Sequence, residues 1–118
     1  MAIRHPFGKY PSVVTLAETS SNVYNYEVQY PVEVLLKGTA IGAAATLNLT
    51  AHADLAAGTI FMVRFLCDGT GRALTVKPLI YANGSAFTGT ASKQSTLTLI
   101  YNGTIFLPVA FVASIDVA

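Results

Sequence analysis

The stretch LAAGTIFMVRFLCDGTGRALTVKP, residues 55–78, has the pattern of a strand, a glycine-rich turn and a second strand. Alternate positions between residues 59 and 67 place apolar side chains on one side, whereas the other side mixes apolar residues with Arg64. We therefore expect the first strand to be covered on both sides. The turn DGTGR, residues 68–72, supplies two glycines for positive φ angles and an aspartate that can hydrogen-bond its own backbone. The whole stretch predicts a β-hairpin.

Further strands are expected on both sides of this stretch. Apolar and polar patterning predicts strands at residues 23–30, 32–37, 45–51, 59–67, 73–77, 95–101 and 104–112. The last two are joined by Asn102-Gly103, the strongest short-range signal for a hairpin. Residues 52–57 are the one candidate for a helical turn, and residues 79–94 are expected to form a long loop or an irregular edge strand. This spacing predicts an all-β fold, specifically an antiparallel, jelly-roll-like β-sandwich.

The first 22 residues differ in composition from the rest. They contain Pro6, Gly8 and Pro11 and four consecutive polar residues at 19–22, so we interpret residues 1–22 as an extended N-terminal arm. Residues 23–118 then form the β-sandwich, because a chain of 118 residues is about one domain in size. The apolar and basic side chains of the arm are the expected interface with a neighbouring subunit: Ile3, Arg4, His5, Phe7, Lys9 and Tyr10.

Charge is scarce in this chain. Charged residues make up 11% of the sequence and apolar residues 53%, against about 25% charged in an ordinary soluble domain. Part of the surface is therefore expected to be buried against other protein. The net charge of +1, without a run of Lys or Arg, argues against nucleic-acid binding. The charge-free run at residues 94–115 contains Pro108 and a turn, so it does not predict a membrane-spanning helix.

Two further features concern the compartment. The first residues lack the apolar stretch of a secretory signal, so we expect the protein to be made and used without the standard export route. The single cysteine, Cys67, shares a strand side with aromatic and aliphatic residues. We expect it to be a buried thiol that packs as a small hydrophobe.

No arrangement of residues predicts catalysis. The chain has two histidines, His5 and His52, and no GxSxG motif. His52 and Asp54 are close in sequence, but a metal site would need more ligands nearby. The glycines of the DGTGR turn are not followed by the helix pattern of a phosphate loop. We therefore expect no enzyme activity, no metal site and no cofactor.

The strand predicted at residues 23–30 carries an aromatic stripe. Tyr24, Tyr26 and Tyr30 share one side of it. We interpret the stripe as part of the sheet core, with the hydroxyls reaching the edge. The alternative is a platform on which sugar rings stack, because aromatic faces suit pyranose rings.

The segments DLAAGTIFMVRFLCDGTGRALTVKP and STLTLIYNGTIFLPVAF, residues 54–78 and 95–111, together resemble a β-module of tailed-bacteriophage virion proteins. The module recurs in capsid decoration proteins, head fibres and tail fibres, and the resemblance covers about residues 46–112. Its motifs correspond here to the following residues: Leu55 to Thr59, Phe61 to Phe65, Asp68 to Arg72, Leu74 to Val76 and Asn102 to Thr104. The module often places tryptophan and proline after its second strand, whereas this chain reads KPLIYANG and has no tryptophan.

The resemblance implies a structural role in a virion. A single module of this length implies an auxiliary, or decoration, capsid protein that binds the major capsid protein and stabilises the shell. It further implies a homo-oligomer, with a trimer favoured, that is made in the host cytoplasm and ends in the virion. The alternative is a receptor-binding or carbohydrate-binding module, or an adaptor, of a head fibre, tail fibre or tail tip, which would use the tyrosine stripe and the loop at residues 79–94.

Overall fold

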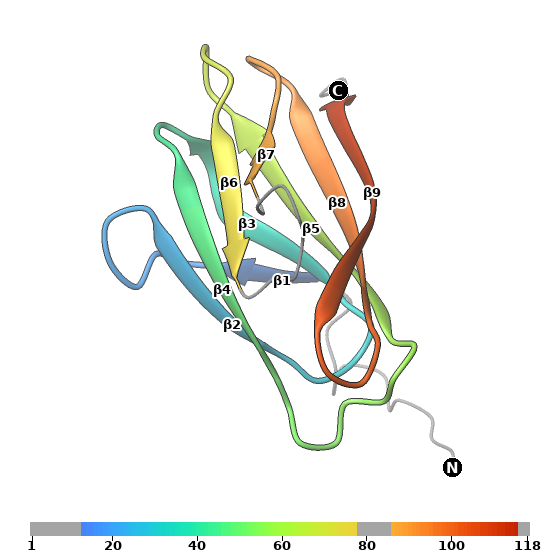
Figure 1. Ribbon diagram of the computed structural model, residues 1–118. Coiled ribbons are helices and arrows are strands. Elements are labelled where there is room, and N and C mark those ends of the chain that lie inside the picture. The colour runs from blue at the N-terminus through green and yellow to red at the C-terminus, as the bar shows by residue number, and fades with distance from the viewer. Residues whose placement is uncertain (1–12, 78–85, 116–118) are drawn as a thin grey trace.

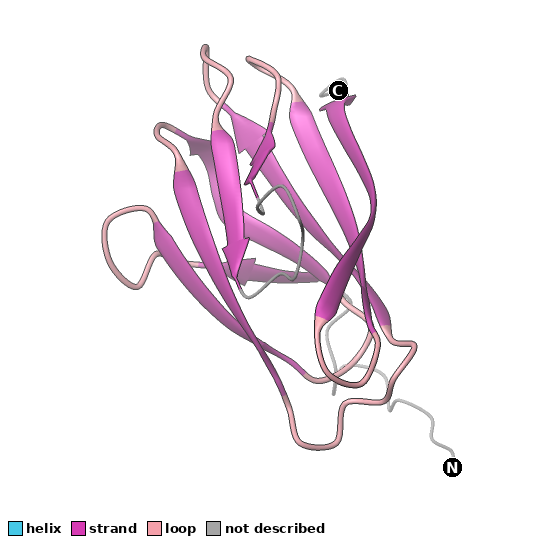
Figure 2. Ribbon diagram, in the orientation of Figure 1, coloured by secondary structure: helices cyan, strands magenta, loops and turns pink. Residues whose placement is uncertain are grey.

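The computed structural model describes residues 13–77 and 86–115, and all regular secondary structure within these ranges is β-strand (Figure 2). The strands in chain order are β1 Val13–Leu16, β2 Val23–Val28, β3 Glu33–Ile41, β4 Ala45–Ala51, β5 Ile60–Cys67, β6 Ala73–Lys77, β7 Ala86–Thr88, β8 Gln94–Tyr101 and β9 Phe106–Ile115. The all-β fold class predicted from the sequence is confirmed. Residues 52–57 contain turns and no helix, so the helical turn considered there is absent.

The strands form two mixed sheets. One has five strands in the order β1-β3-β5-β8-β9, and the other has four in the order β2-β4-β6-β7. Figure 1 shows the two sheets as layers, with the strands of the smaller sheet in front of those of the larger one. From β1 to β6, successive strands belong alternately to the larger and the smaller sheet.

The expected antiparallel arrangement is wrong for much of the molecule. Among the described strands, four pairings are parallel (β1 with β3, β3 with β5, β2 with β4 and β4 with β6) and three are antiparallel. The reason is the alternation between sheets. Each connection crosses to the other layer, so neighbours in one sheet are two strands apart in sequence and run in the same direction. Patterning along single strands carries no information about this choice.

The hairpin predicted for residues 55–78 is also wrong. Both segments are strands, β5 and β6, but they lie in different sheets. The two edges of β5 are already occupied by β3 and β8, so β6 pairs with β4 instead. The turn at residues 68–72 is therefore a corner between the sheets. Asp68 shapes it, accepting hydrogen bonds from the Thr70 backbone N–H and from the Arg72 guanidinium.

The second predicted hairpin is confirmed. β8 and β9 are antiparallel and adjacent, and the turn between them holds Asn102 and Gly103. The Asn102 side-chain oxygen accepts hydrogen bonds from the backbone N–H groups of Thr104 and Ile105, both at 2.9 Å. Gly103 has a φ of 102°, in the region that favours glycine. Here local turn chemistry was sufficient to define the connection.

The core lies between the two sheets. Alternate side chains are buried in one cluster, to which β5 contributes Phe61 and Phe65 and β4 contributes Leu47 and Leu49, each at most 2% exposed. Each such side chain contributes about 1.5–3 kcal/mol when fully buried. The buried thiol predicted at Cys67 is confirmed, with 1% exposure.

The N-terminal region is described from residue 13 onward. β1 lies within the range 1–22 expected as an arm, and it pairs with β3 at the edge of the larger sheet. The six expected interface residues (Ile3, Arg4, His5, Phe7, Lys9 and Tyr10) lie outside the described residues. Of the loop expected at residues 79–94, residues 79–85 also lie outside them, and residues 86–88 form β7.

Candidate interaction surface

The five-stranded sheet has a second face that points away from the core, and we call it the outer face. Side chains alternate along a strand, so outward positions fall between the buried ones, as Ile60, Met62 and Arg64 do on β5. The register aligns outward positions of all five strands in one row: Val13, Glu33, Met62, Thr98 and Ala110. The outer face is thus a continuous surface made by the whole sheet.

Large apolar side chains are exposed on the outer face. Val13 is 44% exposed, Ile60 52%, Met62 37% and Val112 52%, and each occupies an outward position. Ile60 lies beside Ile100 of β8, which extends the apolar surface across the sheet. The sequence predicted a β5 covered on both sides, but the outer side is open in the single chain. Contiguous exposed apolar surface of this kind marks a site of interaction.

We call the outward residues that are aligned across neighbouring strands the paired rows of the outer face. Among the described residues of these rows, one is acidic, Glu33, and one is basic, Arg64. Arg64 Nη2 lies 3.1 Å from Glu33 Oε1, and the two side chains are 28% and 24% exposed. The Nε atom of Arg64 is buried and has no hydrogen-bond partner within the described part of the chain. The pair therefore lies close against the sheet, with the apolar stem of Arg64 covering its neighbours. The two charges of these paired rows therefore cancel.

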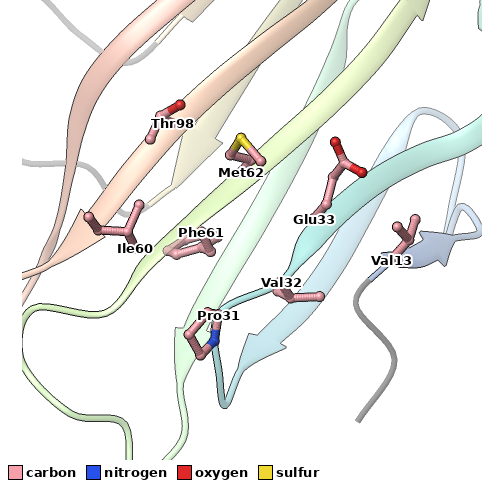
Figure 3. Close-up of a pocket in the computed structure, with 8 residues that line it drawn as sticks. All are labelled: Val13, Pro31, Val32, Glu33, Ile60, Phe61, Met62 and Thr98. Atoms are coloured by element: carbon pink, nitrogen blue, oxygen red, sulfur yellow. The ribbon is translucent and has the colours of Figure 1, made fainter. Parts of the chain in front are cut away.

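An open hollow of about 390 Å³ is present on the outer face. Its lining residues are Val13, Pro31, Val32, Glu33, Ile60, Phe61, Met62 and Thr98. Figure 3 shows Glu33, Met62 and Thr98 on three neighbouring strands, with Val13 at the far side of the row. Most of this lining is apolar, so the hollow suits an apolar side chain better than a charged ligand.

The outward side of the four-stranded sheet is polar instead. Asn48 of β4 donates a hydrogen bond to the Asn25 side-chain oxygen at 2.9 Å, and Asn25 donates one to the Thr19 hydroxyl at 2.8 Å. Threonines occupy the neighbouring row, where Thr46 pairs with Thr75 of β6. The two outer surfaces therefore differ, because the one on the smaller sheet is polar and the one on the larger sheet exposes large apolar side chains.

The tyrosine stripe is divided between core and surface. Tyr24 is 1% exposed, so its ring is part of the core and is not available to stack on a sugar. Tyr26 is partly buried, and desolvation, with a smaller effect of Tyr30, raises its pKa to about 12. The interpretation of the stripe as part of the sheet core is confirmed for Tyr24. The loop at residues 79–94, which the sugar-binding alternative would use, lies partly outside the described residues.

The residues considered for chemistry are in turns. The Asp54 backbone N–H donates a hydrogen bond to His52 Nδ1 at 3.0 Å, and the Asp54 carboxylate is 3.9 Å from the same nitrogen. The Asp54 side chain is 92% exposed. In residues 13–77 and 86–115, no three His, Cys, Asp or Glu side chains are grouped to hold a metal ion. His52 therefore shapes a turn in this structure.

Sequence reasoning singled out the N-terminal arm and missed the outward residues of β8 and β9 as part of a surface. The signal was present in β5, where the outward positions are mostly apolar. It was also present in the low overall charge. The sequence pattern did not indicate which strands share a sheet, and the larger sheet joins β1, β3, β5, β8 and β9.

Comparison of the sequence with models of known protein families and with curated proteins finds no match. Among the described residues, the structure contains no helix long and apolar enough to cross a membrane.

Proposed function

We propose that this protein is a structural component of a tailed-phage virion, and specifically an auxiliary capsid protein that binds the major capsid protein and stabilises the shell. The observation that carries the proposal is the outer face, a sheet surface with several exposed apolar side chains and one ion pair on a small domain. Exposed apolar surface of this kind is typical of a site that binds other protein. The resemblance of residues 46–112 to virion modules is the reason for proposing a tailed-phage virion as the place of action.

In this proposal the protein acts by contact and has no enzyme activity. Buried apolar surface contributes about 25 cal/mol per Å² before the cost of association is deducted, and the contact is repeated at many symmetry-related positions on a shell. In this proposal the two packed sheets hold the outer face in place. The N-terminal arm reaches the shell, and a homo-oligomer presents several arms at once.

The arm is tested by removing it. Deletion of residues 1–10 should leave a folded protein. When it is added to capsids prepared without this protein, it should no longer co-sediment with them, because the deletion removes the apolar and basic side chains expected to dock on the shell. A matched variant keeps the length and replaces Ile3, Phe7 and Tyr10 by serine, and it should show the same loss. Circular dichroism confirms that both variants fold. Capsid binding undiminished in both would refute the docking role of the arm.

The receptor-binding alternative predicts a different result. A module that recognises glycans or host receptors should bind to a glycan array or adsorb to host cells. A decoration protein should do neither. Binding to either surface at micromolar protein concentration would replace the proposed function by the alternative.

A further inference from the structure

We propose that the outer face of the five-stranded sheet is covered by the same face of a second copy of this chain. The inference rests on the proposed function, since it names the partner of the apolar surface that carries it. Three features of the described residues point to a second copy: the charge of the face, its size and the state of the nearest sheet edge.

The charge of the outer face suits self-association. Glu33 and Arg64 already form an ion pair at 3.1 Å, so the paired rows of the face carry no net charge and the same rows of a second copy are not repelled. In a symmetric interface the same patch serves both partners. A surface of one sign would oppose such pairing, because like charges would then face each other and repel. A face whose two charges cancel permits it.

The size of the outer face is sufficient for a stable contact. Five strands about 4.8 Å apart, with β5 and β8 eight residues long, give a surface of roughly 600 Å². Two copies would then bury about 1,200 Å², the lower end of the range for specific protein interfaces. Two twisted sheets pack face to face at about 10 Å separation, as the sheets of a sandwich do.

The edge of the same sheet is a poor site for pairing with another copy. The edge strand β9 contains Pro108, which has no backbone N–H to donate to a further strand. Its pairing with β8 shifts register at two places, which bends the strand. Prolines and bulges are devices that block edge-to-edge association. The β9 edge is therefore unsuited to association, which favours contact through the outer face over pairing at this edge.

The experiment measures the molar mass of the isolated protein by size-exclusion chromatography with light scattering, without capsids. At about 50 µM, above the micromolar Kd that a small interface supports, we expect about twice the 12.4 kDa mass of one chain, because a contact between identical faces joins two copies. Met62→Lys and Ile60→Lys place a charge in the middle of the contact and should each weaken association by about tenfold or more. Thr50→Lys, on an exposed position of the opposite sheet, should leave the mass unchanged.

A second readout is chemical crosslinking. Met62→Cys should join two copies through a short thiol-reactive crosslinker, and Thr50→Cys should not. The native Cys67 is 1% exposed and does not compete. If Met62→Lys fails to fold, Ile60→Lys keeps the test valid, because Ile60 is the more exposed of the two at 52%.

Three results would overturn the inference. The first is a monomeric full-length protein at that concentration. The second is equal dissociation by Thr50→Lys and by the outer-face variants. The third is a monomer that associates only after deletion of residues 1–10, which would show that the arm covers the face of its own chain. The proposed function fails on a different result. If Met62→Lys dissociates the oligomer but the parent protein never binds capsids, this inference stands and the virion role is refuted.

Discussion

Asp68 shows how one side chain fixes the path of the chain between the sheets. Its carboxylate accepts hydrogen bonds from Arg72 Nε at 2.9 Å and Nη2 at 2.8 Å, and from the Thr70 backbone N–H at 3.1 Å. The hydrogen bonds from Arg72, followed by that from Thr70, hold the pKa of Asp68 below its usual value. The backbone oxygen of Asp68 also accepts a hydrogen bond from the Ser92 N–H. The residue therefore joins the corner to the loop before β8.

The lowered pKa of Asp68 predicts a pH dependence of stability. A carboxyl group whose pKa is lower in the folded state stabilises the fold above its unfolded pKa, and this contribution is lost as pH falls through the folded pKa. Asp68→Asn should therefore lower the melting temperature at neutral pH, and the difference from the parent should shrink as the pH falls below the ordinary aspartate pKa of 3.8. Asp54→Asn is the control for net charge, because that side chain is 92% exposed. A difference that persists at low pH would contradict the assigned role.

Gly89 is a second residue whose identity follows from packing. A Cβ atom at this position would lie 2.6 Å from Cys67 Sγ and 2.7 Å from Ser95 Oγ, both buried. Gly89→Ala should therefore destabilise the protein by about 1–3 kcal/mol through overpacking. Gly69→Ala should have little effect, because nothing lies within 4 Å of a Cβ there and the φ angle is not positive. Urea unfolding of the two variants checks this, and equal stability would show that the core accommodates the methyl group.

At the scale of the elements, the β8–β9 hairpin depends on its turn. Gly103 has a φ of 102°, which an alanine adopts only at a cost of about 1–3 kcal/mol. Gly103→Ala should lower the free energy of unfolding by that amount. Thr104→Ala is the matched control, because Thr104 is exposed and contributes its backbone N–H to the turn, which alanine retains. Denaturant unfolding in which the two variants are equally stable would contradict the need for glycine.

The elements were predictable from the sequence where local chemistry decides them. Alternation of apolar residues located β2 to β6 within a few positions, and Asn102-Gly103 identified the one hairpin for which local chemistry was sufficient. The pairing of β5 with β3 and β8 was not predictable, because partner choice depends on the other strands of the chain. For the same reason a turn with good hairpin chemistry at residues 68–72 became a corner.

At the scale of the whole molecule, composition predicted surface that is buried against other protein, which stays a prediction, and it did not indicate where the exposed apolar residues would lie. The exposed apolar residues Val13, Ile60, Met62 and Val112 belong to strands far apart in sequence. Only the assembled sheet brings them onto one face. The polar row of Asn25 and Asn48 on the opposite sheet makes the same point, because the contrast between the two surfaces exists only after folding.

The alternation of strands β1 to β6 between the two sheets has a consequence for how the molecule opens. Each of these strands is continuous in the chain with strands of the other layer, so withdrawing one disturbs the hydrogen bonds of both sheets. This part of the fold should therefore open as one cooperative unit and show uniform protection from hydrogen exchange. Among the described strands, β9 pairs with β8 alone, and a short turn joins the two. We therefore expect β9 to detach first while β8 stays paired with β5.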